Sequence, residues 1–257
     1  MKYKIEASCG CHIGRIRSNN EDNFYFNGRI LQQDHISLRH PACQQFTTDT
    51  DVILAVFDGM GGEEHGEIAS FVAANTMMDC HKALQRYIKS PRDFLKESCD
   101  EMNERICKKA KELNTTRMGS TVVSLFFSSD EIYSCNIGDS KAFRMRDGEL
   151  LQLSQDHIDF LPLPGMEAPK RKPRLSQHLG IPSEELRLVP YIAKGELKAG
   201  DLYLICSDGL TDMLSNVEIC AILKESNNIK ECVDKLIEKA LSNGGKDNIT
   251  LILCRIQ

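Results

Sequence analysis

The sequence lacks the long apolar segments that mark exported or membrane-spanning chains. Its first ten residues, MKYKIEASCG, contain no hydrophobic stretch typical of a signal peptide, and no apolar run approaches the length of a membrane span. An excess of positive charge is also absent, because the formal net charge of the 257 residues is −5 at pH 7. No overall positive field would attract nucleic acid. We therefore predict a soluble, cytoplasmic protein that binds neither nucleic acid nor membrane.

Several well-known catalytic motifs are missing as well. The sequence contains no HExxH zinc motif and no GxSxG turn for a serine nucleophile, and its seven histidines are scattered. The glycine-rich stretch 59–66 is not a Walker loop, because Glu67 follows it in place of the lysine and hydroxyl residue that bind nucleotide phosphates. Covalent catalysis by serine or cysteine therefore has no specific support.

Eleven cysteines are present, but they do not form the pattern of a disulfide framework or a zinc cluster. Their number is odd, no CxxC pair occurs, and Cys135, Cys206 and Cys254 lie inside apolar runs. Only one residue separates Cys9 from Cys11, which is poor spacing for a structural zinc site. We expect small buried thiols in a reducing compartment.

The order of the expected elements favours an α+β fold. Hydrophobic residues make up 41% of the chain, which is enough for one large domain or two small ones with a sizeable core. Short runs rich in β-branched and aromatic residues occur in clusters, and segments with helical apolar spacing lie between the clusters. A parallel sheet would instead show a regular alternation of strand and helix.

Nine segments have the composition of strands, and four longer ones have the apolar spacing of helices. The expected strands are residues 3–9, 22–27, 52–57, 120–127, 131–137, 141–146, 187–192, 201–206 and 248–255. The expected helices are residues 63–90, 91–113, 215–225 and 228–242. Asp147-Gly148 predicts a hairpin turn. Residues 28–50 are expected to form a long loop or ribbon, and residues 157–185 a long loop. The basic run 170–174 in that loop is either a solvated face or a binding patch.

Four aspartates lie at the ends of strand-like runs. Asp58 follows VILAVF, Asp139 follows IYSCNIG, Asp208 follows LYLICS, and Asp247 stands just ahead of NITLIL. A buried strand ends at the rim of the core, so these carboxylates could meet at one edge of a sheet structure. Crowded carboxylates repel each other and need a cation to stay ionised. The pattern predicts a site for Mg²⁺ or Mn²⁺, which prefer oxygen ligands.

Glycine follows two of these acids, in Asp58-Gly59 and in Asp208-Gly209. Glycine permits a tight turn and lets backbone oxygens approach a ligand. Each pair taken alone is equally compatible with a plain turn in which both residues serve only the backbone. The repetition of the pattern, with two further acids at strand ends, favours a metal site.

Arg17 lies close in sequence to Glu21 and Asp22. Its planar guanidinium can bind phosphate oxygens with two hydrogen bonds, which suits a two-metal centre that cleaves phosphoesters. Alternatively, Arg17 forms a surface ion pair with Glu21 or Asp22.

Six motifs occur in the order of a known family. They are Arg17-Ser-Asn-Asn-Glu21-Asp22, AVF-Asp58-Gly59-Met-Gly-Gly, Met118-Gly119-Ser120-Thr121, Asn136-Ile-Gly-Asp139-Ser140, Cys206-Ser-Asp208-Gly-Leu-Thr-Asp212 and Lys246-Asp247-Asn248. With them the chain resembles the metal-dependent Ser/Thr protein phosphatases of type 2C in their compact bacterial form, from about residue 5 to 256. The resemblance implies one catalytic domain over residues 1–257. It also implies a four-layer αββα sandwich, with two central antiparallel sheets flanked by helices.

The resemblance further implies a pair of Mn²⁺ or Mg²⁺ ions at one end of the sandwich. Asp58 would bridge the two ions, and the backbone carbonyl of Gly59 would bind one of them. Asp208 and Asp247 would hold the other ion.

Other site residues carried over from the family act around this pair. Glu21 and Asp22 would act near the metals, largely through bound water. Asp139 would hold a third, weaker metal ion together with Asp208. Arg17 would bind the substrate phosphate.

The implied activity is hydrolysis of phosphoserine and phosphothreonine in proteins, by direct attack of a metal-bridging water. Its expected partners are phosphorylated substrates of a Ser/Thr kinase of the same cell, and the kinase itself. One alternative is a pseudophosphatase that binds phosphoproteins without turnover. Another is a phosphatase dedicated to one regulator, such as an anti-anti-sigma-like protein.

Three positions depart from the family pattern. Met60 stands where some relatives have a histidine proposed to protonate the leaving oxygen, which methionine cannot do. Lys141 replaces an arginine that commonly follows the Asp-Ser pair. Residues 157–182, which correspond to a flap associated with substrate choice, are short and rich in proline and basic residues.

Overall fold

Two antiparallel sheets form the centre of the computed structural model, which describes residues 2–60, 65–84, 90–116, 118–160 and 173–257. The first sheet has the order β3 (Ala42–Thr47), β1 (Lys4–His12), β12 (Ile249–Ile256), β11 (Leu202–Cys206), β8 (Lys141–Arg146) and β9 (Glu149–Gln152). The second has the order β10 (Tyr191–Glu196), β7 (Glu131–Ile137), β6 (Val122–Ser128), β4 (Val52–Met60) and β2 (Asp22–Phe26), and the short β5 (Gly119–Ser120) also pairs with β4.

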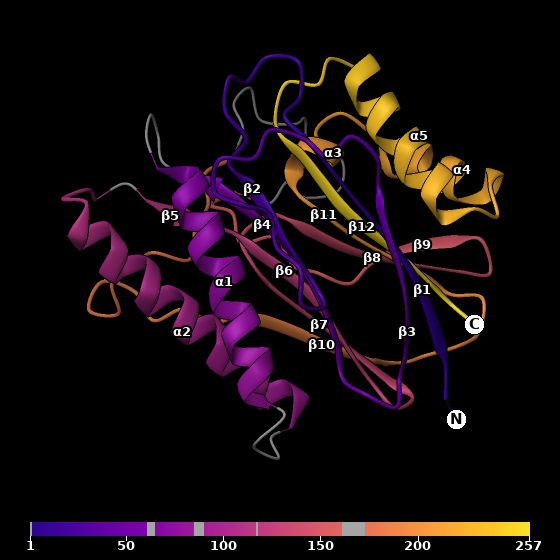
Figure 1. Ribbon diagram of the computed structural model, residues 1–257, viewed down its shortest axis with the longest axis horizontal. Helices are drawn as coiled ribbons and strands as arrows, with labels where there is room; N and C mark the ends of the chain where they lie inside the picture. Colours follow the sequence, from indigo (N-terminus) through magenta and orange to yellow (C-terminus); the bar gives the residue numbers. More distant parts are fainter. Residues whose placement is uncertain (1, 61–64, 85–89, 117, 161–172) are drawn as a thin grey trace.

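Helices cover the outer face of each sheet (Figure 1). Helices α1 (Gly66–Leu84) and α2 (Pro91–Glu112) pack on the second sheet. Helices α3 (Asp208–Thr211), α4 (Asn216–Glu225) and α5 (Ile229–Ser242) pack on the first. The fold is therefore the α+β sandwich of four layers that the sequence predicted.

Strand β4 shows why the run VILAVF is apolar throughout. Val52, Leu54 and Val56 point into the core between the two sheets, whereas Ile53 and Phe57 point into the core beneath α1 and α2. Because side chains alternate between the faces of a strand, a strand buried on both faces needs apolar residues at every position.

Side chains from both sheets fill the core between them. The ring of Phe127 from β6 meets that of Tyr203 from β11 edge to face, with ring centroids 5.9 Å apart. This apolar layer ends where the acidic residues of β2 and β4 begin.

Most of the predicted elements are confirmed. The second helix begins at Pro91 after the N-cap Ser90, and the two C-terminal helices begin and end within one residue of expectation. The hairpin between β8 and β9 turns at Asp147 and Gly148, whose φ angles of 51° and 80° suit a two-residue primed turn. The first helix is described only from Gly66 to Leu84.

Two strand predictions are wrong in detail. Residues 42–47, expected in a loop or ribbon, form strand β3, and the strand expected at 187–192 is β10, residues 191–196. Both are edge strands, and several side chains in each are exposed, so neither has the continuous apolar run of a fully buried strand.

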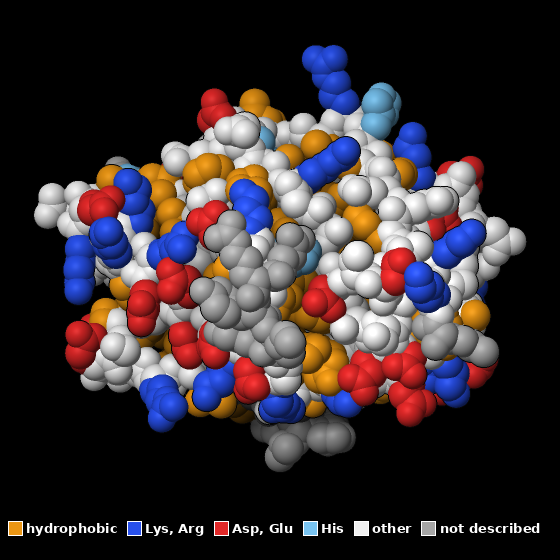
Figure 2. All heavy atoms as spheres, turned by 60° about the horizontal axis from the view of Figure 1, so that its bottom comes forward, with side chains coloured by type: hydrophobic (Ala, Val, Ile, Leu, Met, Phe, Trp, Pro, Cys, Tyr) orange, Lys and Arg blue, Asp and Glu red, His pale blue; other side chains and the backbone are white. Residues whose placement is uncertain are grey.

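Parts of several sequence predictions lie outside the described residues. These are Gly61 and Gly62 of the first glycine motif, residues 63–64 and 85–89 of the expected first helix, and residues 161–172 of the expected loop and flap, which include the basic residues 170–172. In the described part of the chain, no helix is long and apolar enough to cross a membrane. Figure 2 shows Lys and Arg side chains lying among Asp and Glu side chains over one face of the molecule.

Candidate metal centre

Asp22 and Asp58 lie directly opposite each other on neighbouring strands. The register of β2 and β4 pairs Asp22 with Asp58 and Phe24 with Val56. Phe24 and Val56 both point into the core between the sheets. Since the side chains two residues along a strand share a face, Asp22 and Asp58 continue these inner faces to the rim of the core.

Three more aspartates reach this rim from other elements. Asp139 follows β7 by two residues, Asp208 is the first residue of α3, and Asp247 precedes β12 by two residues. Burial, followed by the negative charges of Asp208, Asp22, Asp139 and Asp247, raises the pKa of Asp58 well above its ordinary value. The structure therefore brings together around Asp58 the acids that the sequence predicted to converge, although β4 continues through Asp58 to Met60 instead of ending before it.

Asp22 is the most deeply placed of the five acids, and its side chain is 1% exposed. The hydroxyl of Ser207 donates a hydrogen bond of 2.7 Å to its Oδ2. The same hydroxyl accepts a bond of 3.0 Å from the backbone N–H of Thr250. Burial, opposed in part by the Ser207 bond, raises the pKa of Asp22 to about 7. Asp22 thus lies behind the partly exposed carboxylates.

The glycines that follow Asp58 and Asp208 are required by close backbone contacts. A Cβ on Gly59 would lie 2.1 Å from the carbonyl oxygen of Gly66, and one on Gly209 would lie 1.9 Å from the carbonyl oxygen of Asn248. Both distances are far below van der Waals contact. The Asp-Gly pairs are therefore more than plain turns, because each glycine lets a neighbouring segment approach an acid of the site.

Asn248 fixes the segment that carries Glu21. Its side-chain amide donates bonds of 2.9 Å to the carbonyl oxygens of Ile13 and Asn19. Its Oδ1 accepts a bond of 2.8 Å from the N–H of Glu21. The carbonyl oxygen of Glu21 in turn accepts a bond of 3.0 Å from Gly59 N–H. Burial and then the charge of Glu67 raise the pKa of Glu21.

Arg17 forms an ion pair with Asp247, and its Nη2 lies 2.7 Å from Oδ2. The two side chains are 51% and 32% exposed. The pairing with Glu21 or Asp22 considered from the sequence is not formed. Asp22 is buried beneath the rim. The carboxyl of Glu21 packs against Gly66 instead, because a Cβ added to Gly66 would lie 2.6 Å from its carboxyl carbon. Arg17 thus touches an expected metal ligand.

Two hydroxyl side chains connect Asp58 on strand β4 to the turn that carries Asp139. Thr121 N–H donates to the carbonyl oxygen of Asp58 at 2.8 Å, and Asp58 N–H donates to the hydroxyl of Thr121 at 3.2 Å. That hydroxyl is 2.7 Å from the buried hydroxyl of Ser140. The sequence alone indicated no role for Thr121, Ser207 or Asn248. Only their positions inside the ordered motifs could have identified them as residues of the site.

The donor chemistry of this rim fits hard divalent cations. The described residues contain no group of three or more His, Cys, Asp and Glu side chains that could hold a metal ion by themselves. Mg²⁺ and Mn²⁺, however, take much of their oxygen coordination from water and backbone carbonyls. Carboxylates whose charges raise the pKa of Asp58 also need a cation if Asp58 is to ionise beside them. Asp58, Asp208, Asp247 and the Gly59 carbonyl offer oxygen donors of this kind.

Comparisons with known proteins agree on one family. A family model described as protein phosphatase 2C matches residues 30–243. The serine/threonine phosphatase stp of Listeria welshimeri is 30% identical over 255 residues, which cover 93% of this chain and 91% of that protein. A putative protein phosphatase 2C-type of Streptococcus pyogenes is 32% identical, over 97% of this chain and 96% of that protein.

A solved structure shows the same fold. The catalytic domain of the serine threonine protein phosphatase PstP, in complex with two manganese ions, matches with a TM-score of 0.72 and 25% identity. The match covers 99% of both chains.

Replacing Gly209 by alanine should destabilise the protein, because its Cβ would meet a backbone oxygen that cannot rotate away. We expect the free energy of unfolding to fall by about 2 kcal/mol in urea denaturation. Gly195→Ala is the matched control, since the nearest atom to its Cβ is Ile132 Cγ2 at 3.6 Å. Equal stability of the two variants would contradict the close approach.

The metal-free protein should lose stability as the pH rises through the range in which Asp22 ionises. The pKa of Asp22 is about 7 in the folded state against an ordinary value of 3.8. At a pH between these two values, the folded state therefore keeps a proton that the unfolded state has lost. Stability attributable to Asp22 therefore falls as pH rises across this window. Thermal unfolding in EDTA should show a larger drop from about pH 5 to about pH 8 for the wild type than for Asp22→Asn. Identical pH profiles would refute this.

Proposed function

We propose, given that this chain belongs to the protein phosphatase 2C family, that it hydrolyses phosphoserine and phosphothreonine in proteins by direct attack of water on phosphorus. The chain is a metal-dependent serine/threonine phosphatase of the 2C type, as the family match and the named relatives indicate. The observation that carries the proposed chemistry is the position of Asp58 among four other aspartates at the rim of the inter-sheet core.

Three aspartates and one backbone carbonyl would hold the two ions. Asp58 has a central place among the acids, which suits a bridge between both ions. The Gly59 carbonyl would bind one ion, and Asp208 and Asp247 the other. When bound, the ions supply a water of lowered pKa and positive charge next to the phosphate oxygens. Asp139, together with Asp208, would hold a third and weaker ion.

Glu21 and Asp22 support the pair from behind. Asp22 is nearly inaccessible and hydrogen-bonded to Ser207, so it would act on the ions mainly through its charge, and the bound water expected from the family would be its one contact with them. Glu21 is fixed by Asn248 and Gly59 and is partly exposed, so it can hold water at the edge of the site.

Arg17 would bind the substrate phosphate. Its pair with Asp247 is half exposed, and such pairs are weak enough to exchange. With a metal ion held by Asp247, the guanidinium would no longer be paired there and would donate hydrogen bonds from its planar fork to phosphate oxygens.

The leaving oxygen takes its proton from water or from a group other than residue 60. Met60, the last residue of β4, has no proton to give. The proposed reaction accordingly uses no dedicated acid at this position.

The proposed partners are phosphorylated proteins of a Ser/Thr kinase in the same cell, and the kinase itself. The eleven cysteines are free thiols, which fits action in the reducing cytoplasm. Site residues extend from Arg17 to Asp247, and we therefore treat residues 1–257 as one catalytic domain.

Asp58→Asn should abolish Mn²⁺-dependent hydrolysis, because the amide keeps the shape but removes the bridging charge. We expect kcat on a phosphothreonine peptide and an aryl phosphate to fall by at least about a hundredfold, and EDTA to do the same to the wild type. Asp49→Asn, a change at an exposed acid paired with Lys2, is the control and should remain active.

Activity that survives EDTA or Asp58→Asn would overturn the two-metal mechanism. Mn²⁺ binding without turnover on any phosphosubstrate would instead favour the pseudophosphatase.

Arg17→Ala should raise KM for a phosphopeptide by about tenfold or more, since a charged phosphate contact contributes roughly 1–3 kcal/mol. The same change removes the ion pair on Asp247, so the Mn²⁺ concentration for half-maximal activity should not rise. Steady-state kinetics at several Mn²⁺ concentrations separates these effects. An unchanged KM would leave Arg17 as a surface ion pair only.

A further inference from the structure

Lys141 brings a positive charge to a strand end beside the candidate metal centre. It is the first residue of β8 and follows Asp139 by two residues. In the pairing of β8 with β11, Lys141 lies opposite Cys206. Cys206 in turn precedes Asp208 by two residues. The positive charge of Lys141 and the negative charge of Asp208 both act on the pKa of the Cys206 thiol.

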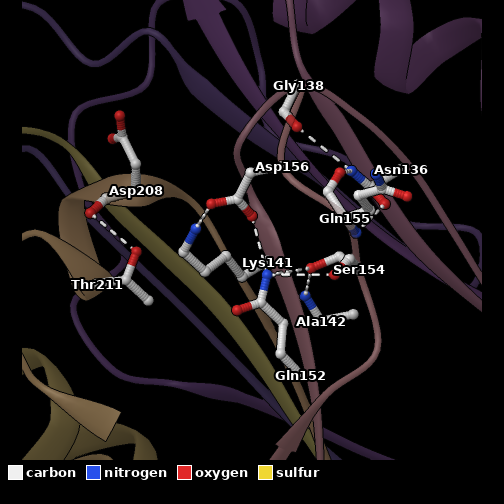
Figure 3. Close-up of polar contacts among 10 residues, drawn as sticks. All are labelled: Asn136, Gly138, Lys141, Ala142, Gln152, Ser154, Gln155, Asp156, Asp208 and Thr211. Atoms are coloured by element: carbon white, nitrogen blue, oxygen red, sulfur yellow. Dashed lines mark hydrogen bonds and ion pairs between the residues drawn. The ribbon is translucent and has the colours of Figure 1, made fainter. Parts of the chain in front are cut away.

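The ammonium is bound by an acid that belongs to none of the metal positions. Lys141 forms an ion pair with Asp156, and the two side chains are only 19% and 18% exposed. The Nε2 of Gln152 donates a bond of 2.9 Å to the other carboxylate oxygen of Asp156. Figure 3 shows the lysine side chain extended to Asp156, with the carboxylate of Asp208 directed elsewhere.

The segment that carries Asp156 is fastened to the turn that carries Asp139. The buried side chain of Asn136 donates to the carbonyl oxygen of Gln155 at 2.7 Å and accepts from its N–H at 3.1 Å. His157 N–H donates to the carbonyl oxygen of Gly138 at 3.0 Å, and Gly138 N–H donates to His157 Nδ1 at 3.2 Å. Asp156 thus stands at a fixed place between two anchored residues.

Arg17 shows what an unrestrained cation does at this rim. It lies 2.7 Å from Asp247 and occupies an oxygen that a metal ion would use. A lysine side chain carries its charge on a flexible four-carbon stem. Without Asp156, the Lys141 ammonium could likewise turn to Asp139 or Asp208.

We propose that Asp156 is a positioning residue that keeps the Lys141 ammonium away from the carboxylates of Asp139 and Asp208. Asp156 acts by binding the ammonium of Lys141, so that this cation does not compete with a divalent ion at the two acids. The inference rests on the metal roles proposed above for these two acids.

The test is equilibrium Mn²⁺ binding by calorimetry, without substrate, to four variants of the full chain. Asp156→Asn should weaken Mn²⁺ binding by about tenfold, because it releases the ammonium while keeping the side-chain shape. Lys141→Met should bind Mn²⁺ at least as tightly as the wild type. The double variant should return to within about twofold of Lys141→Met. Lys141→Arg keeps a charged partner for Asp156 and should stay close to the wild type.

Asp79→Asn controls for the loss of one negative charge, since Asp79 pairs with Arg105 near the far end of α1. It should leave Mn²⁺ binding unchanged. A merely structural role for the pair predicts that both single variants weaken binding and that the double variant does not recover.

That result, or wild-type affinity in Asp156→Asn, would overturn the proposal. Mn²⁺ binding without hydrolysis by the wild type would instead refute the phosphatase mechanism and leave this inference standing. A wild type that binds no Mn²⁺ would overturn both.

Discussion

Repulsion between carboxylates at the rim of the inter-sheet core is the constraint on which the rest of the site depends. Asp22 and Asp58 reach the rim because they continue the inner faces of two paired strands. Other aspartates arrive from three separate turns, and their charges add to burial in raising the pKa of Asp58. A fold can keep such groups together only when protons, side-chain cations or metal ions balance them. The surrounding glycines, hydroxyls and amides hold the turns where that balance is needed.

The sequence predicted the parts of this arrangement that depend on local pattern. VILAVF predicted a buried strand, and the first polar residue after it is Asp58 at the rim. The edge strand β3 was not predicted, because alternate side chains in ACQQFT are exposed and the segment lacks an apolar run. The role of Asn248 could not be predicted for another reason. Its partner Glu21 is 227 positions away, and no local pattern reveals a hydrogen bond across that distance. The motifs predicted which acids belong to the site, whereas the hydrogen bonds that hold these acids together depend on tertiary structure.

Two side-chain cations at the rim illustrate opposite ways of managing positive charge. Arg17 is half exposed and pairs directly with Asp247, so its contact is weak and exchangeable. Lys141 is mostly enclosed and is bound by Asp156, an acid outside the site. An exchangeable arginine suits a ligand that comes and goes, such as a phosphate. A restrained lysine contributes a fixed field without occupying the carboxylates.

Protons also bear on this balance. Asp22, with a pKa of about 7, and Asp58, with a pKa well above its ordinary value, both hold protons more firmly than free carboxylates do. A divalent ion at Asp58 would require its ionised form, so the ion would compete with protons there and with the guanidinium of Arg17 at Asp247. Under the proposed metal roles, metal affinity, proton binding and the freedom of Arg17 would be one linked equilibrium. The acid cluster would then couple occupancy of the metal centre to the availability of the arginine that is proposed to bind phosphate.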